Sequence, residues 1–154
     1  MRRDVLEAFV EKLLRKVTGG ERVIAEEDGD YPVRYGSALY FVRVVGETVA
    51  DVQVFAIAVD DVEATPELLA ELNELNTQVR FARVFHVRGQ VLVEADLAGA
   101  GLEAEGFFPA CDAVATITDR VGADLAKKHG GRTAFEDSKD DGYSPPEVPL
   151  GMYL

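Results

Sequence analysis

The sequence predicts a single α+β domain in which helices pack on a five-stranded antiparallel sheet. Three observations lead to this prediction. The chain has 154 residues, a length typical of one domain. Apolar residues recur with the period of a helix near both ends of residues 1–135, and between them lie three strand-like segments, a middle helix and two further strand-like segments. Residues 136–154 are mostly acidic and polar and contain two adjacent prolines, so we expect a tail outside the domain.

The two terminal helices are amphipathic, and each ends at a pair of glycines. Glycine readily takes the left-handed conformation that closes a helix, which places these ends at Gly19-Gly20 and Gly130-Gly131. The last helix spans about 105–128. Both apolar stripes are wide, and one face of a sheet must be buried, so we expect both helices on the same face. The stripe residues are Leu6, Phe9, Val10, Leu13, Leu14 and Val17 in the first helix, and Phe107, Cys111, Val114, Thr118, Val121 and Leu125 in the last.

The strands before the middle helix differ in the strength of their signals. Residues 22–27 are strand-like and end in a turn sequence, and residues 31–35 are extended because Pro32 restricts the backbone. Residues 39–45 and 48–59 are rich in β-branched and aromatic side chains and are joined by a short turn. These two segments therefore predict a hairpin.

The middle helix has a clear beginning. Thr65 can cap it and Pro66 suits the first helical position, and we expect the helix to end at Asn76. A second hairpin follows, with strands 79–87 and 90–97. The apolar side of the helix consists of Leu68, Leu69, Leu72 and Leu75.

Apolar side chains occupy both faces of strand 48–59 in its second half. A sheet with one solvated face carries polar residues at alternate positions, and this strand does so only at its start. Its cover would be a bound peptide, the apolar end of the chain at 146–154, or the middle helix. The residues that point one way are Val52, Val54, Ala56 and Ala58, and those that point the other way are Phe55, Ile57 and Val59.

Composition excludes several classes of function. Sixteen basic and 28 acidic residues give a net charge of -12, which repels phosphates, so we expect neither nucleic acid nor a membrane as a partner. One cysteine and two histidines provide neither an internal disulfide nor a thiolate or histidine-rich metal site, and we expect no cofactor. Charged residues interrupt the N-terminal apolar positions, and no window is apolar for about 18 residues. We therefore expect a cytoplasmic protein.

No constellation of residues indicates a reaction, and we expect no catalytic residue. Cys111 lies on an apolar helix stripe and is interpreted as a core residue. The carboxylates at 26–30 are interpreted as a solvated turn. Glu94 and Asp96 point to the same side of one strand, about 7 Å apart, and His86 lies on the polar face of the neighbouring strand. An enzyme or small-ligand sensor that uses these last three residues is the alternative to a binding protein.

Three short motifs resemble a known family. They are DGDYPV at 28–33 followed by LYFVRV at 39–44, LNELN at 72–76, and the closing helix from 123 to 131. Together with the order helix, three strands, helix, two strands, helix, they resemble the type III secretion chaperones and the YbjN-like peptide-binding chaperone domains. The similarity covers roughly residues 3–135, and the motifs consist of scaffold residues.

The resemblance implies a non-enzymatic domain with the type III secretion chaperone-like order α-β-β-β-α-β-β-α, which binds a peptide or a partly unfolded protein segment. Secretion chaperones of this kind are commonly homodimers, so we expect a homodimer. A role in secretion does not carry over, because this chain lies nearer the YbjN-like branch. The expected peptide-binding residues are Tyr40, Val42, Val44, Val52, Val54, Phe55 and Ile57, and the expected dimer contacts are Leu68, Leu69, Leu72 and Leu75.

Overall fold

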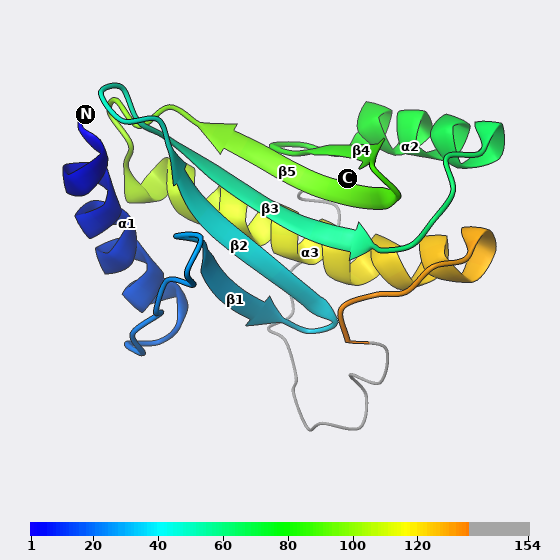
Figure 1. Cartoon of the computed structure of the whole chain (residues 1–154), viewed down its shortest axis with the longest axis horizontal. Coiled ribbons are helices and arrows are strands. Elements are labelled where there is room, and N and C mark those ends of the chain that lie inside the picture. The colour runs from blue at the N-terminus through cyan, green and yellow to red at the C-terminus, as the bar shows by residue number, and fades with distance from the viewer. Residues whose placement is uncertain (136–154) are drawn as a thin grey trace.

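The computed structural model describes residues 1–135, and the elements follow the order that the sequence predicts (Figure 1). The expected tail at 136–154 lies outside the described residues. None of the described helices combines the length and hydropathy that a membrane span requires. The helices are α1 (Arg3–Val17), α2 (Pro66–Gln78) and α3 (Ala104–His129), and the strands are β1 (Tyr31–Tyr35), β2 (Ala38–Val45), β3 (Asp51–Val59), β4 (Arg83–Val87) and β5 (Gln90–Leu97).

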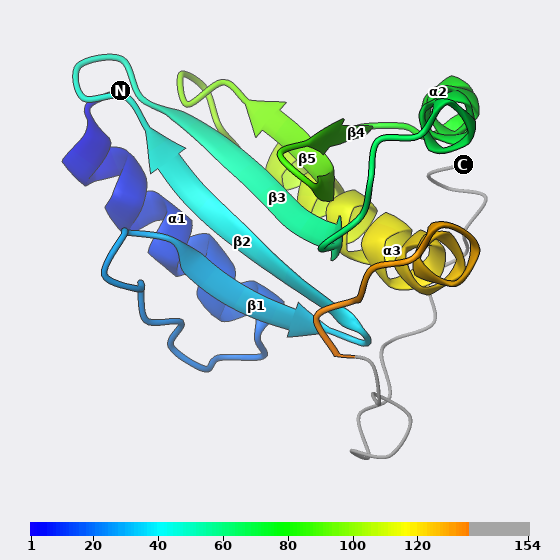
Figure 2. The ribbon, with the colours of Figure 1, turned by 45° about the vertical axis from the view of Figure 1, so that its right-hand side comes forward.

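The five strands form one antiparallel sheet in the order β1-β2-β3-β5-β4, so β1 and β4 are its edges. α1 and α3 lie on the same face, which confirms the sequence-based expectation (Figures 1 and 2). α2 lies along the β4 edge. The opposite face carries no helix of the described chain, and we call it the open face; its residues include Phe41, Arg43, Phe55, Ile57 and Glu94.

The core lies between the sheet and the two helices α1 and α3. Successive side chains of a strand point to opposite faces, so alternate residues of β2 and β3 enter this core. The stripe of α3 meets them, with Phe107 fully buried near the start of the helix. The largest fully buried side chains also include Leu6, Leu14, Leu68, Ile117, Leu125, Val10, Val42, Val52, Val54 and Val84.

Two local predictions were wrong. Residues 22–27 form an irregular segment beside β1, fastened where the Glu26 N–H donates to the Asp30 carbonyl at 2.8 Å. Within the described chain this segment forms no ladder of backbone hydrogen bonds with β1, and a strand requires such a ladder. Val59 points toward the helices instead of the open face, because the register of β3 against β5 shifts between Ile57 and Val59. Such a bulge re-aims the side chain that follows it.

Phe55 lies on the open face, but only 9% of its surface is exposed because neighbouring side chains of that face cover it. The Phe41 ring stacks on it with centroids 5.4 Å apart, and the Arg43 guanidinium lies 4.7 Å from its ring centroid. Neighbours on the same face therefore bury this side chain, and α2 does not reach it. The alternative that 146–154 covers this face concerns residues outside the described part of the chain.

Candidate functional site

A cleft of about 690 Å³ opens beside β1, and its lining comes from the end of α1, the irregular segment 21–24, β1, β2 and the middle of α3. Figure 1 shows how these elements are arranged. We name this cleft the β1 cleft. Its walls combine apolar side chains with charged ones of both signs. It is lined by Val17, Thr18, Glu21, Arg22, Val23, Ile24, Pro32, Val33, Arg34, Tyr35, Tyr40, Asp112 and Ala115.

The outer wall of the β1 cleft is formed by the chain as it leaves α1. Gly19 and Gly20 have φ values of 71° and 105°, a region that favours glycine, and they turn the chain back beside the helix. The Thr18 hydroxyl lies 2.6 Å from the Glu21 carbonyl and holds the start of the next segment to the helix end. This path leaves Ile24 at the cleft with 74% of its surface exposed.

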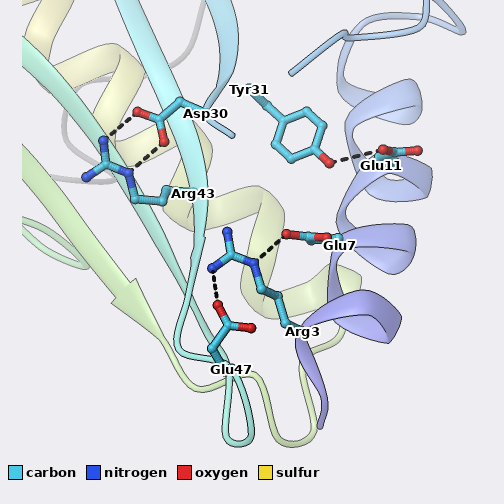
Figure 3. Close-up of polar contacts among 7 residues, drawn as sticks. All are labelled: Arg3, Glu7, Glu11, Asp30, Tyr31, Arg43 and Glu47. Atoms are coloured by element: carbon cyan, nitrogen blue, oxygen red, sulfur yellow. Dashed lines mark hydrogen bonds and ion pairs between the residues drawn. The ribbon is translucent and has the colours of Figure 1, made fainter. Parts of the chain in front are cut away.

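Polar contacts fix α1 against the sheet (Figure 3). The Tyr31 hydroxyl donates to Glu11 Oε1 at 3.0 Å, and burial, followed by this hydrogen bond, raises the pKa of Tyr31 to about 12. The hydroxyl therefore stays protonated and keeps its role as a donor at neutral pH. Arg3 forms two ion pairs. One joins it to Glu7 of α1 at 2.7 Å, and the other joins it to Glu47 in the β2–β3 connection at 3.2 Å. The Tyr31–Glu11 contact therefore joins α1 to β1, and the Arg3–Glu47 contact joins α1 to the β2–β3 connection.

A bidentate ion pair fastens the start of β1 to β2 (Figure 3). The Arg43 guanidinium donates to both oxygens of Asp30 from Nε at 2.6 Å and Nη2 at 2.5 Å. Its hydrogen bond to Asp30 raises the pKa of Arg43. Asp30 is only 3% exposed, so the expectation of a solvated acidic turn was wrong for this residue. The pairing depends on the β1–β2 register, which the local sequence does not reveal.

The two edges of the sheet differ in their exposure to a new strand. At β4, the Val84 N–H donates to Asn76 Oδ1 at 2.8 Å, and Asn76 Nδ2 donates to the Val84 carbonyl at 2.6 Å. The amide therefore occupies both backbone groups of Val84 that face away from the sheet. We expected Asn76 to end the helix, but α2 continues to Gln78.

Among the described residues, β1 has a strand neighbour on one side only, and the β1 cleft lies beside it. Edge strands of this kind are templates for pairing with another chain.

Replacing Asn76 by alanine should loosen α2 from β4. We expect the free energy of unfolding to fall by about 1–3 kcal/mol, because the side chain loses its two hydrogen bonds to Val84 and one to the Leu72 carbonyl, and each contributes about 1 kcal/mol net. Urea denaturation measures this change. Asn73→Ala is the matched control, since it makes the same substitution at an exposed position of the same helix. Equal effects of the two substitutions would show that Asn76 does not seal the edge.

Most of the expected peptide-binding residues lie in the core. Val42, Val44, Val52 and Val54 are at most 2% exposed beneath the helices, where a peptide does not reach them in this conformation. Tyr40 is also buried but lines the β1 cleft. The open face holds the other two, Phe55 and Ile57. Ile24 was not among the expected residues, although it lines the cleft and is exposed. Its sequence signal is an isoleucine outside any strand, a few residues after a glycine pair.

The four leucines of α2 divide between the core and the surface. Leu68 and Leu72 are buried, Leu75 is half-buried and Leu69 is 46% exposed. The inward pair binds α2 to the rest of the domain, which leaves Leu69 as the leucine available for contact with another chain.

The residues of the alternative enzyme or sensor site do not come together. His86 pairs with Val91 and points toward the helix-covered side, where its Nε2 lies 2.8 Å from the Val62 carbonyl. Glu94 and Asp96 lie on the open face, and both pair with Arg83. The sequence placed His86 on the wrong face because β4 begins at Arg83 and its polar and apolar residues do not alternate strictly. Within residues 1–135, no three histidine, cysteine or carboxylate side chains gather as a metal site.

Comparisons with known proteins agree with this architecture. Residues 4–137 match the family model described as T3SS (YopN, CesT) and YbjN peptide-binding chaperone 1. Among solved structures, the crystal structure of the ExsC-ExsE complex is similar, with a TM-score of 0.58 and 16% sequence identity. The alignment covers 77% of this chain and 94% of that chain. At this identity the likeness concerns the fold. A search of curated proteins finds no match.

Proposed function

The chain belongs to the family of T3SS and YbjN peptide-binding chaperones, and we propose that it binds its peptide, or a partly unfolded protein segment, in the β1 cleft. One observation carries this choice of surface. The β1 cleft borders one edge strand of the sheet, while at the opposite edge α2 lies along β4 and Asn76 occupies both outward backbone groups of Val84. These contacts obstruct pairing at β4, so β1 is the edge that suits an extended segment better.

The proposed mode of binding is addition of a strand to the sheet. In this mode the main chain of the ligand pairs with the edge strand and alternate side chains enter adjacent pockets. Apolar side chains of the ligand would contact Val23, Ile24 and Val33, which line the cleft. The net charge of -12 favours ligands that carry basic residues beside the apolar ones, because opposite charges speed and orient association.

Ile24→Asp tests the proposed surface. A suitable probe is ribonuclease A, reduced and carboxamidomethylated so that it remains unfolded, with binding measured by fluorescence anisotropy. We expect the affinity to fall at least about tenfold, because burial of an isoleucine contributes about 1.5–3 kcal/mol and each 1.4 kcal/mol is a factor of ten. The fold should be unaffected, since Ile24 is 74% exposed.

Val49→Asp is the matched control for this experiment. Val49 is 70% exposed and lies in the β2–β3 connection, away from the residues that line the cleft. It receives the same change of charge and loses a similar apolar surface. If Val49→Asp weakens binding as much as Ile24→Asp, general repulsion explains the loss and the β1 cleft is not the binding site.

We also propose that the protein is a homodimer whose contacts include Leu69. The support is the exposed position of this leucine on α2, together with exposed Phe81 just before β4. Light scattering at tens of micromolar is expected to give twice the monomer mass for the unchanged chain and the monomer mass for Leu69→Asp. A monomer mass for the unchanged chain would contradict the proposal.

The remaining parts of the proposal concern the setting in which the chaperone acts. We propose that it acts without catalysis, as expected of a chaperone family. We propose the cytoplasm as its location on the sequence argument given above. Cys111 is a free thiol, and its burial raises its pKa, which suits a core residue better than a nucleophile.

A further inference from the structure

The path of the chain after α3 leads back to the sheet. Asp60 and Arg132 form a two-way backbone bridge, with Asp60 N–H to the Arg132 carbonyl at 2.8 Å and Arg132 N–H to the Asp60 carbonyl at 3.0 Å. Gly131 permits this close approach, because its φ is 91° and a Cβ there would lie 2.5 Å from the Asp60 carbonyl oxygen. Figures 1 and 2 show this segment passing from the end of α3 toward the ends of β1 and β2.

The described chain ends against a side chain of β1. The ring of Phe135 lies against the guanidinium of Arg34, with 4.1 Å between the Arg34 Cζ and the ring centroid. Arg34 belongs to β1 and lines the cleft. A cation over an aromatic face is a favourable contact. The chain beyond Phe135 therefore starts at β1, the strand that borders the proposed binding surface.

The sequence that follows has the pattern of a segment suited to strand addition. Two adjacent prolines at 145–146 disfavour a helix and favour an extended chain. Beyond them, apolar side chains alternate, as in one face of a strand, at Val148, Leu150, Met152 and Leu154. Residues 136–147 can span up to about 40 Å when extended, which leaves ample length to turn back into a cleft that borders β1.

We infer that residues 148–154 occupy the β1 cleft of their own chain and compete with the client. This inference rests on the proposed function of that cleft and adds a means of regulating it. A segment tethered to its binding site by a short linker has an effective concentration in the millimolar range. A segment with a Kd of about 0.1 mM would then fill most of the clefts and weaken client binding about tenfold.

The test uses the full chain with Leu150→Asp and Met152→Asp combined. We expect this variant to bind unfolded ribonuclease A about tenfold more tightly than the unchanged chain. Tyr153→Asp is the matched control, because the alternation places Tyr153 on the opposite side of the segment, and it should leave the affinity within about twofold. A fluorescein-labelled peptide of residues 144–154 is expected to bind the double variant and to lose that binding when Ile24→Asp is added.

The possible failures are distinguishable. Equal affinity of the double variant and the unchanged chain for the client, with binding still sensitive to Ile24→Asp, would overturn the inference and leave the proposed cleft intact. A second outcome is that Ile24→Asp does not affect client binding in the unchanged chain or in the double variant, and that the labelled peptide does not bind. This outcome would overturn both the proposed function of the cleft and the inference. If Tyr153→Asp tightens client binding as much as the double variant does, the inference is also contradicted. The gain in affinity would then not depend on the apolar side of the segment.

Discussion

Phe107→Ala is expected to lower the free energy of unfolding by about 3–5 kcal/mol, the range for removing a fully buried phenylalanine. Phe107 is 0% exposed and lies near the start of α3, within the single core shared by both helices and the sheet. The cavity left behind cannot close easily, because the surrounding β-strands are held by their pairing. Urea denaturation at pH 7 measures the change.

Phe108→Ala is the matched control for this substitution. Phe108 is the next residue, makes an edge contact with Phe107 at 5.9 Å between centroids, and is only partly buried. Its replacement should cost clearly less. Similar costs for the two substitutions would mean that the start of α3 is not packed as the structure shows.

Arg43→Met should destabilise the domain by about 3 kcal/mol. The substitution removes the partner of Asp30, whose side chain is only 4% exposed, and a buried charge without a partner is costly. Methionine keeps most of the apolar stem of Arg43 but also removes the guanidinium that lies over Phe55. The loss therefore reports the ion pair together with this weaker contact. Urea denaturation of the variant measures it.

Two further variants test this prediction, one as a rescue of the buried charge and one as a control. Asp30→Asn combined with Arg43→Met should recover part of the stability, because the buried charge is gone. Arg2→Met is the control for an exposed pair, since Asp4 remains 66% exposed, and it should cost less than about 1 kcal/mol. An Arg43→Met cost no larger than that of Arg2→Met would contradict the assigned role of Asp30 in fastening β1.

The elements of the fold could be predicted because their signals are local. Thr65 accepts from the Leu68 N–H at 3.1 Å, as the cap motif predicts. The turn at Arg88-Gly89 has positive φ at both residues, which a two-residue hairpin requires. The bulge that turns Val59 toward the core was not predictable in this way. It depends on where the segment after α3 meets the end of β3.

The candidate site was less predictable because it depends on tertiary contacts. The two-sided apolarity of β3 gave no indication of which face the helices cover, so core valines were taken as peptide contacts. The cover of Phe55 comes from its cross-strand partner Phe41 and from Arg43. The seal at Asn76 exists only because α2 lies beside Val84. Neither feature has a sequence pattern of its own.

The central claim is that an extended client segment joins the sheet at β1, and hydrogen exchange with and without unfolded ribonuclease A tests it most directly. The measurement uses the double variant Leu150→Asp, Met152→Asp, so that the end of the chain does not compete. The account predicts slower exchange of amides within residues 21–36 when the client is bound, and unchanged exchange within residues 83–87, whose edge Asn76 seals. Slower exchange at residues 83–87, with none at residues 21–36, would contradict it.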